Sequence, residues 1–152
     1  MNKERSSRLE GRIRSGTLSR RDIVRRLGEL AFGSANDCVR LVLEDCPDLD
    51  ALELSLLSEV RRSDKGGVEV KLIDRLKAVE ALGQVKGDDS YNTLISLLRS
   101  PRADMRAAAA TALGALGDQK ARAHIDHLSK TEQDSVVLEA MKQALSKLHS
   151  NE

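Results

Sequence analysis

Apolar and polar residues along most of this chain follow the roughly 3.6-residue period of a helix. The first such segment covers about 20–32, where Ser19 and Asp22 have the spacing of a capping box and Gly33 follows the last apolar residue. The pattern therefore predicts a mostly helical protein. A second helix is expected to begin at Ser34 or Asn36 and to end before Pro47. Further helices are expected over about 73–84, 89–99, 102–116, 119–129 and 132–149.

The period changes to two on both sides of the sequence Ser63-Asp64-Lys65-Gly66-Gly67. Two alternating runs around an Asp-x-Gly-Gly turn predict a β-hairpin over about 55–72. The first arm also has the spacing of a helix, through Leu52, Leu56 and Val60. Strand and helix therefore both stay open for that arm.

The helices after residue 73 repeat every 31 to 32 residues. Ala81-Leu82-Gly83 matches Ala112-Leu113-Gly114, and an Ala-Leu pair returns at 144–145. The expected contact face of the middle helix, 102–116, is mostly alanine, which buries little area, so neighbouring helices must approach it closely. A period of this length, made of two short helices, predicts a solenoid whose units bury their apolar faces against one another.

Composition supports helix-on-helix packing. Phe32 and Tyr91 are the only aromatic residues among 152, so Leu, Ile, Val and Ala must form the core. No apolar run approaches the roughly 18–20 residues of a membrane span, and the first residues lack the apolar segment of a secretory signal. Cys38 and Cys46 are expected to be reduced thiols. We therefore expect a cytoplasmic protein.

The net charge of +1 conceals a basic N-terminal region. Residues 1–26 carry nine basic and three acidic side chains, a net of +6, which leaves the rest of the chain acidic. Such a region can bind the phosphates of nucleic acid or an anionic partner, although a solvated tail explains it equally well. The candidate nucleic-acid-binding residues are Arg5, Arg8, Arg12, Arg14, Arg20 and Arg21.

A family resemblance rests on the run Asp104-x-Arg106-x-x-Ala109-x-x-Ala112-Leu113-Gly114-x-Leu116-Gly117-Asp118. It resembles the repeat of HEAT-like proteins of the short, bacterial, phycobilisome-lyase type, over about 88–149. The resemblance implies an α-α superhelix, with aspartate and arginine in polar contacts between units and Ala-Leu-Gly at helix-packing sites. Most members are non-catalytic and bind proteins. In the last unit Leu138 replaces the arginine and Ser146 the glycine, which suits a capping unit.

The front of the chain, about 22–83, is similar to segments of phage terminase small subunits. The resemblance is carried by Arg26-Leu27-Gly28-Glu29-Leu30-Ala31-Phe32-Gly33 and by Lys71-Leu72-Ile73-Asp74-Arg75-Leu76-Lys77-Ala78. It implies a phage-derived DNA-binding or DNA-packaging accessory. Only about 20 residues precede the matched region, which is too few for the separate helix-turn-helix of those proteins. DNA binding would then depend on the basic arm.

Three segments follow from these patterns: a basic arm over 1–18, a capping module of helices and hairpin over 19–72, and HEAT-like repeats over 73–152. No nucleophile, base and oxyanion set can be assembled, so we expect a non-enzymatic protein without a cofactor. His124 and His127 lie three apart on a helix, but no set of further ligands that would converge on them is evident, so a metal site is not expected.

The leading functional hypothesis is a protein-binding scaffold or adaptor. Its candidate surface comprises Arg99, Arg102, Arg106 and Lys120, although Arg106 also suits a contact between repeat units. The alternative is the terminase-like DNA accessory. A third hypothesis is a homo-oligomer that forms through the free edges of the hairpin.

Overall fold

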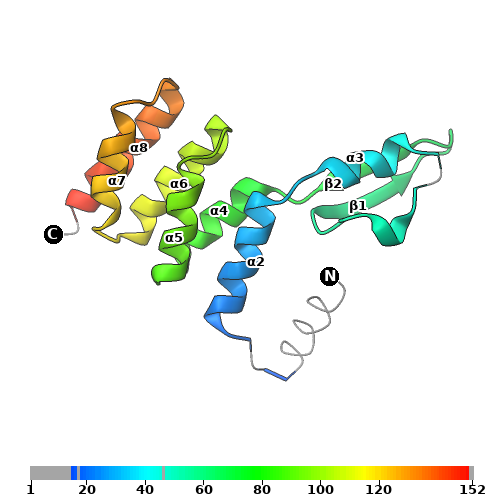
Figure 1. Cartoon of the computed structure of the whole chain (residues 1–152), viewed down its shortest axis with the longest axis horizontal. Helices are drawn as coiled ribbons and strands as arrows, with labels where there is room; N and C mark the ends of the chain where they lie inside the picture. The colour runs from blue at the N-terminus through cyan, green and yellow to red at the C-terminus, as the bar shows by residue number, and fades with distance from the viewer. Residues whose placement is uncertain (1–14, 17, 46, 151–152) are drawn as a thin grey trace. The chain divides into compact units, whose positions relative to one another are not determined.

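The computed structural model describes residues 15–16, 18–45 and 47–150 (Figure 1). It is mostly helical with one small antiparallel sheet, which confirms the predicted fold class and shows that the first arm of the hairpin is a strand. In chain order the elements are α2 (Arg20–Phe32), α3 (Asn36–Leu43), a 3-10 turn (Leu49–Ala51), β1 (Leu57–Arg62), β2 (Val68–Leu72), α4 (Arg75–Gln84), α5 (Asp88–Leu97), α6 (Ala103–Leu116), α7 (Ala121–Ser129) and α8 (Ser135–His149).

The described chain divides into two compact units. The hairpin unit is built from Phe32–Asp74, and the repeat unit combines Ser19–Ala31 with the chain from Arg75 onward. The sequence pattern predicted one module over 19–72 that contains both α2 and the hairpin. In the structure, α2 belongs instead to the repeat unit. The reason is that Val24 and Ala31 of α2 are buried in the same apolar cluster as the repeat helices.

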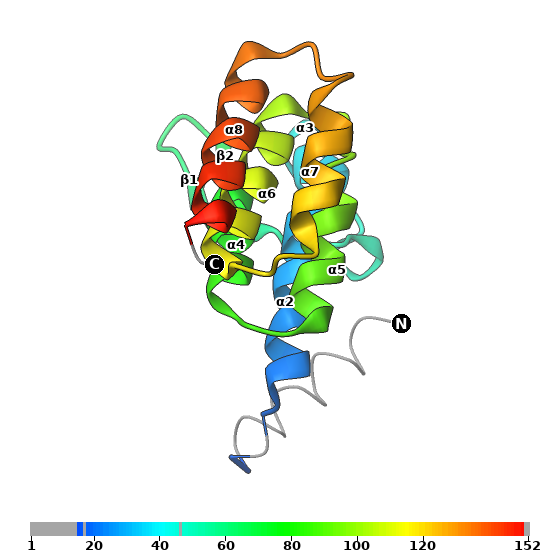
Figure 2. The same cartoon turned by 90° about the vertical axis from the view of Figure 1, so that its left-hand side faces the viewer.

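In the repeat unit, α4, α6 and α8 lie side by side in one layer, and α5 and α7 pack against them as a second layer (Figure 2). Helix α2 lies beside α5, as the contact of Gly28 with Thr93 shows: a Cβ on Gly28 would lie 3.5 Å from Cγ2 of Thr93. The Ser19–Asp22 capping box begins α2: the Asp22 carboxylate accepts from the Ser19 N–H at 3.0 Å, and the Ser19 hydroxyl accepts from the Asp22 N–H at 3.4 Å.

Close contacts at two glycines join the helices of the first layer. A Cβ on Gly83 would lie 2.9 Å from Cα of Ala112, and one on Gly114 would lie 2.9 Å from Cα of Ala144. Because these are backbone atoms, any side chain at either glycine would push the helices apart. The same contact recurs one repeat later, as the matching of Ala-Leu-Gly segments predicts.

Helix α6 ends at a left-handed glycine, and α8 departs from the glycine pattern of α4 and α6. Gly117 has a left-handed conformation at φ +75°, and its N–H donates to the Leu113 carbonyl at 3.2 Å, which ends α6. In α8, Ser146 occupies the position that corresponds to Gly83 and Gly114, and it is exposed. Helix α8 therefore lacks the close-packing site that α4 and α6 use.

The hairpin unit pairs β1 and β2 antiparallel, with Val60 opposite Val70 and a bulge between Leu57 and Glu59. The N–H of Ser63 donates to the Gly67 carbonyl at 2.8 Å, and Gly66 adopts φ +83°. This is a three-residue loop with a left-handed glycine, as the Asp-x-Gly-Gly sequence predicts.

Helix α3 packs against β2 in the hairpin unit. Cys38 of α3 and Leu56, just before β1, are its two buried apolar side chains among the described residues. A hydrogen bond from the Glu53 N–H to the Asp37 carboxylate, 2.9 Å long, holds the segment before β1 to α3 and lowers the pKa of Asp37. The core of this unit is therefore small.

Substituting Gly114 with alanine tests the close contact between α6 and α8. We expect Gly114→Ala to lower the free energy of unfolding by about 1–3 kcal/mol, because the new Cβ forces the two helix backbones apart. Urea denaturation followed by circular dichroism measures this. Gly28→Ala is the matched control: its Cβ makes only an ordinary contact with Thr93, so we expect a gain of about 0.5–1 kcal/mol from helix propensity. Equal effects of the two substitutions would contradict the packing role of Gly114.

Candidate functional site

The solvent side of the α4–α6–α8 layer combines a central strip of small residues with longer side chains on both flanks. On α6 the strip consists of Ala107 and Ala108, which are half-buried, and Thr111 and Ala115, which are exposed. The exposed residues at the corresponding positions of the flanking helices are Leu76, Lys77, Glu80 and Gln84 on α4, and Glu139, Gln143 and Lys147 on α8. We call the four α6 residues the α6 strip.

The α6 strip was not predicted from the sequence, in which the alanines of this helix indicated packing sites only. The available signal is the helical spacing: Ala107, Thr111 and Ala115 follow at intervals of four. This row lies away from the fully buried Ala109 and Leu113. Alanines therefore serve both the packed and the exposed side of α6.

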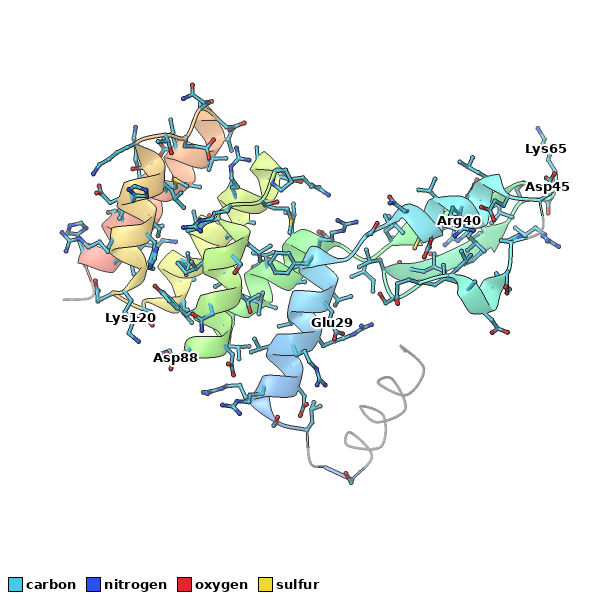
Figure 3. All side chains as sticks on the ribbon, in the orientation of Figure 1. Glu29, Arg40, Asp45, Lys65, Asp88 and Lys120 are labelled. Carbon is cyan, nitrogen blue, oxygen red and sulfur yellow. The ribbon has the colours of Figure 1, made fainter. Side chains whose placement is uncertain are left out.

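The candidate basic residues do not form one patch. Arg99 and Arg102 lie in the connection between α5 and α6, at the start of α6, whereas Lys120 follows its end. A helix of 14 residues is about 21 Å long, so these groups lie near opposite ends of the layer. Nζ of Lys120 is 3.5 Å from a carboxylate oxygen of Asp88, and both side chains are exposed (Figure 3).

Arg102 is held by a neighbouring acid. Its guanidinium donates to both carboxylate oxygens of Asp104, at 3.1 and 2.6 Å, and these bonds lower the pKa of Asp104. Half of the Arg102 side chain remains exposed. Arg102 can therefore still contact another molecule from its exposed side.

Arg106 is engaged inside the repeat unit. Its Nε and Nη2 donate to the two carboxylate oxygens of Glu132, at 2.7 and 2.9 Å, and its Nη1 donates to the Ser100 carbonyl at 3.0 Å. Glu132 also accepts from the N–H groups of Gln133 and Asp134. The ion pair joins the start of α6 to the connection between α7 and α8. Arg106 thus makes the contact between units that was one of its two expected roles.

The ion pair has a clear electrostatic effect on Glu132. Only 8% of the Glu132 side chain and 19% of the Arg106 side chain are exposed. The hydrogen bonds from Arg106 outweigh the opposing effect of burial and lower the pKa of Glu132 to about 2. The ionised carboxylate therefore stabilises the folded state at neutral pH.

Two of the six candidate nucleic-acid-binding arginines lie within the described residues. Nε of Arg21 is 3.3 Å from a carboxylate oxygen of Asp89 at the start of α5. The guanidinium of Arg20 lies against Gly87: a Cβ added to this glycine would lie 2.9 Å from it. Both side chains thus contact the start of α5. Arg5, Arg8, Arg12 and Arg14 lie outside the described residues.

The two histidines of α7 are exposed, and the His124 ring meets Tyr91 edge-on with ring centroids 6.4 Å apart. Within the described part of the chain, no group of three or more His, Cys, Asp and Glu side chains could hold a metal ion. None of the described helices is long and apolar enough to cross a membrane. A hollow between α7 and α8 is lined by Gln119, Arg122, Ala123, Asp126, Leu145 and His149.

Replacing Arg106 with methionine tests the contact between units. We expect Arg106→Met to lower the free energy of unfolding by about 2–3 kcal/mol at pH 7, because it leaves the Glu132 carboxylate shielded from water without its cation. Arg102→Met is the matched control, and its exposed pair should contribute less than about 1 kcal/mol. Urea denaturation measures the free energy of unfolding of both variants. Equal losses would show that the Arg106–Glu132 pair stabilises the protein no more than the exposed Arg102–Asp104 pair does.

The same variant should also change the response to acid. The folded-state pKa of Glu132, about 2, lies below its ordinary value of 4.5, so its contribution is complete above about pH 4.5 and is lost as the pH falls towards 2. Arg106→Met should therefore lose less stability than the parent protein between pH 5 and pH 3, since the pKa of Glu132 is no longer lowered by that pair. Parallel acid titrations of the two proteins would contradict this assignment.

The comparisons with known proteins agree with the packing of the helices. Searches of the curated proteins and of the solved structures found no match. The resemblances to phycobilisome-lyase-type proteins and to phage terminase small subunits therefore gain no support and stay predictions. Residues 73–146 match the family model described as HEAT repeats. The matched region begins just before α4 and does not include α2. The helices α4 to α8 therefore form a short array of HEAT-like repeats.

Proposed function

We propose that this protein is a non-enzymatic, protein-binding scaffold or adaptor of the cytoplasm that binds its partner on the solvent side of the α4–α6–α8 layer. The observation that supports this proposal most directly is the stacking at Gly83 and Gly114, which aligns three helices into one continuous surface. Proteins with HEAT repeats commonly use such surfaces to bind other proteins.

The side chains of this surface suit the close approach of a partner segment. The distance between two packed helices is about 8–10 Å and depends on the side chains at the contact. Ala107, Ala108 and Ala115 add little bulk, so a partner can approach the α6 backbone closely. Glu80 of α4 and Gln143 of α8 stand at the flanks and can form hydrogen bonds to it.

The basic residues at the start of α6 extend this proposed surface. The exposed half of Arg102, together with Arg99, would attract an acidic segment of the partner. Arg106 would contribute through the position of this connection rather than by direct contact. Lys120 lies near the other end of the layer and would contact a separate part of the partner.

A bulky substitution in the α6 strip tests the proposed surface. We expect Thr111→Arg to reduce the recovery of the bound partner at least tenfold, because the long side chain occupies the space above the alanines. Capture from cell lysate, with quantitative mass spectrometry, identifies the partner and measures its recovery. His127→Arg, on the exposed side of α7, is the matched control and should leave recovery unchanged.

Two further variants separate the ends of the layer. Arg99→Glu with Arg102→Glu should weaken capture more than Lys120→Glu if an acidic segment binds at the start of α6. Circular dichroism should show native helix content for every variant, since all these positions are exposed. Unchanged recovery with Thr111→Arg would rule out the α6 strip as the binding surface.

The alternative proposal is a phage-derived, terminase-like DNA-binding or DNA-packaging accessory. Arg20 and Arg21 contact the start of α5, and the other four candidate arginines precede them in the chain. Deleting residues 1–14 removes these four and retains the Ser19–Asp22 cap of α2. We expect any salt-sensitive binding of duplex DNA, measured by fluorescence anisotropy, to disappear in this variant. Absence of binding by the full chain at low salt would exclude the alternative.

A further inference from the structure

Strand β1 is the more open side of the hairpin. Val60 on β1 is 50% exposed, whereas Val70, directly opposite on β2, is half-buried. Helix α3 contacts β2 more extensively than β1, in keeping with the lower exposure of Val70. The free edge of β1 is therefore the side on which another strand can be added.

The hydrogen-bond pattern directs two residues of β1 toward that edge. Ser63 and Gly67 form a hydrogen-bonded pair at the tip, and such pairs alternate with non-bonded pairs along an antiparallel ladder. Arg61 therefore bonds to β2, while the N–H and C=O groups of Val60 and Arg62 point away from it. Among the described residues, neither of these two makes a backbone hydrogen bond outside the ladder. An edge of this kind accepts a further strand.

The charges on β1 match a second copy of the same strand. Glu59 and Arg61 flank Val60 and lie on the opposite face of the sheet from it. If two β1 strands pair antiparallel about Val60, each Glu59 stands directly opposite Arg61 of the second copy, and the two Val60 side chains meet at the centre. Opposite charges in directly opposed positions stabilise a sheet, and the symmetry supplies two such pairs.

We propose that two copies of this protein associate through their β1 edges, in the antiparallel register centred on Val60. The resulting four-stranded sheet runs β2–β1–β1–β2, with one α3 against each outer strand. The pairing covers the exposed part of Val60. It also strengthens a unit whose apolar core is small, since a two-stranded hairpin is only marginally stable without further packing.

Strand β2 has a similar charge pattern, with Glu69 and Lys71 on either side of Val70. The contact of α3 with β2 and the lower exposure of Val70 favour β1 as the pairing edge. Five or six residues of paired strand bury less than the roughly 1,200 Å² of a standard stable interface. The association is therefore expected at high micromolar rather than nanomolar concentration.

Charge reversal and its rescue test the pairing. Sedimentation equilibrium of the full chain, up to near-millimolar concentration, should show a monomer–dimer equilibrium. Arg61→Glu places like charges opposite each other twice across the proposed interface and should weaken dimerisation at least tenfold. The four-fold exchange Glu59→Arg, Arg61→Glu, Glu69→Arg and Lys71→Glu restores every opposite-charge pair, both within the hairpin and between copies. It should return the dimer affinity to within about threefold of the parent.

Glu69→Arg is the matched control, because it places a like charge opposite Arg61 within one hairpin without touching the β1 edge. This variant should dimerise like the parent, and circular dichroism should show that all variants remain folded. A protein that stays monomeric at every concentration would overturn the proposal. So would a dimer that is indifferent to Arg61→Glu, or one that Glu69→Arg weakens as strongly as Arg61→Glu does.

Discussion

The repeat unit depends on the distance between the backbones of α4, α6 and α8. Alanine side chains remove little apolar surface from water, so they stabilise a protein only where many atoms of the neighbouring helix lie within contact distance. Gly83 and Gly114 permit that distance, because each lets the next helix rest its backbone where a side chain would otherwise stand. The stability of each helix in this layer is therefore shared with its neighbour, and no helix of the layer is self-sufficient.

The ion pair of Arg106 and Glu132 complements these contacts. The glycine contact between α6 and α8 lies toward the far end of α6, whereas the ion pair lies at its start. One contact limits the distance between the helices, and the other limits how far one can slide or rotate relative to the next. Two separated points of attachment define the orientation of a helix much better than one. The exposed sides of the layer are thereby presented in a defined arrangement.

Much of the fold could be predicted from the sequence, because local periodicity determines which face of each helix is apolar. The register of Gly83 and Gly114 and the hairpin turn at 63–67 follow from this kind of signal. The membership of α2 in the repeat unit does not, since periodicity shows that a face is buried but not which distant helix buries it. The separation of Arg102 from Lys120 was hidden for a similar reason: nearness in sequence says little about position when a whole helix lies between.

The path of the chain through the repeat unit has a consequence for how that unit folds. The chain leaves it after Ala31 and returns at Arg75, so α2 can join the repeats only by closing a loop that contains the whole hairpin unit. The entropy lost in closing a loop rises slowly with its length, by about 0.6 kcal/mol for each doubling. Contacts among α4 to α8 close shorter loops and lose less entropy, so α2 is expected to dock last. Changes in the length of the hairpin unit would thus alter the stability of the repeat unit very little. The hairpin unit can therefore vary in size without disturbing the packing of the repeats.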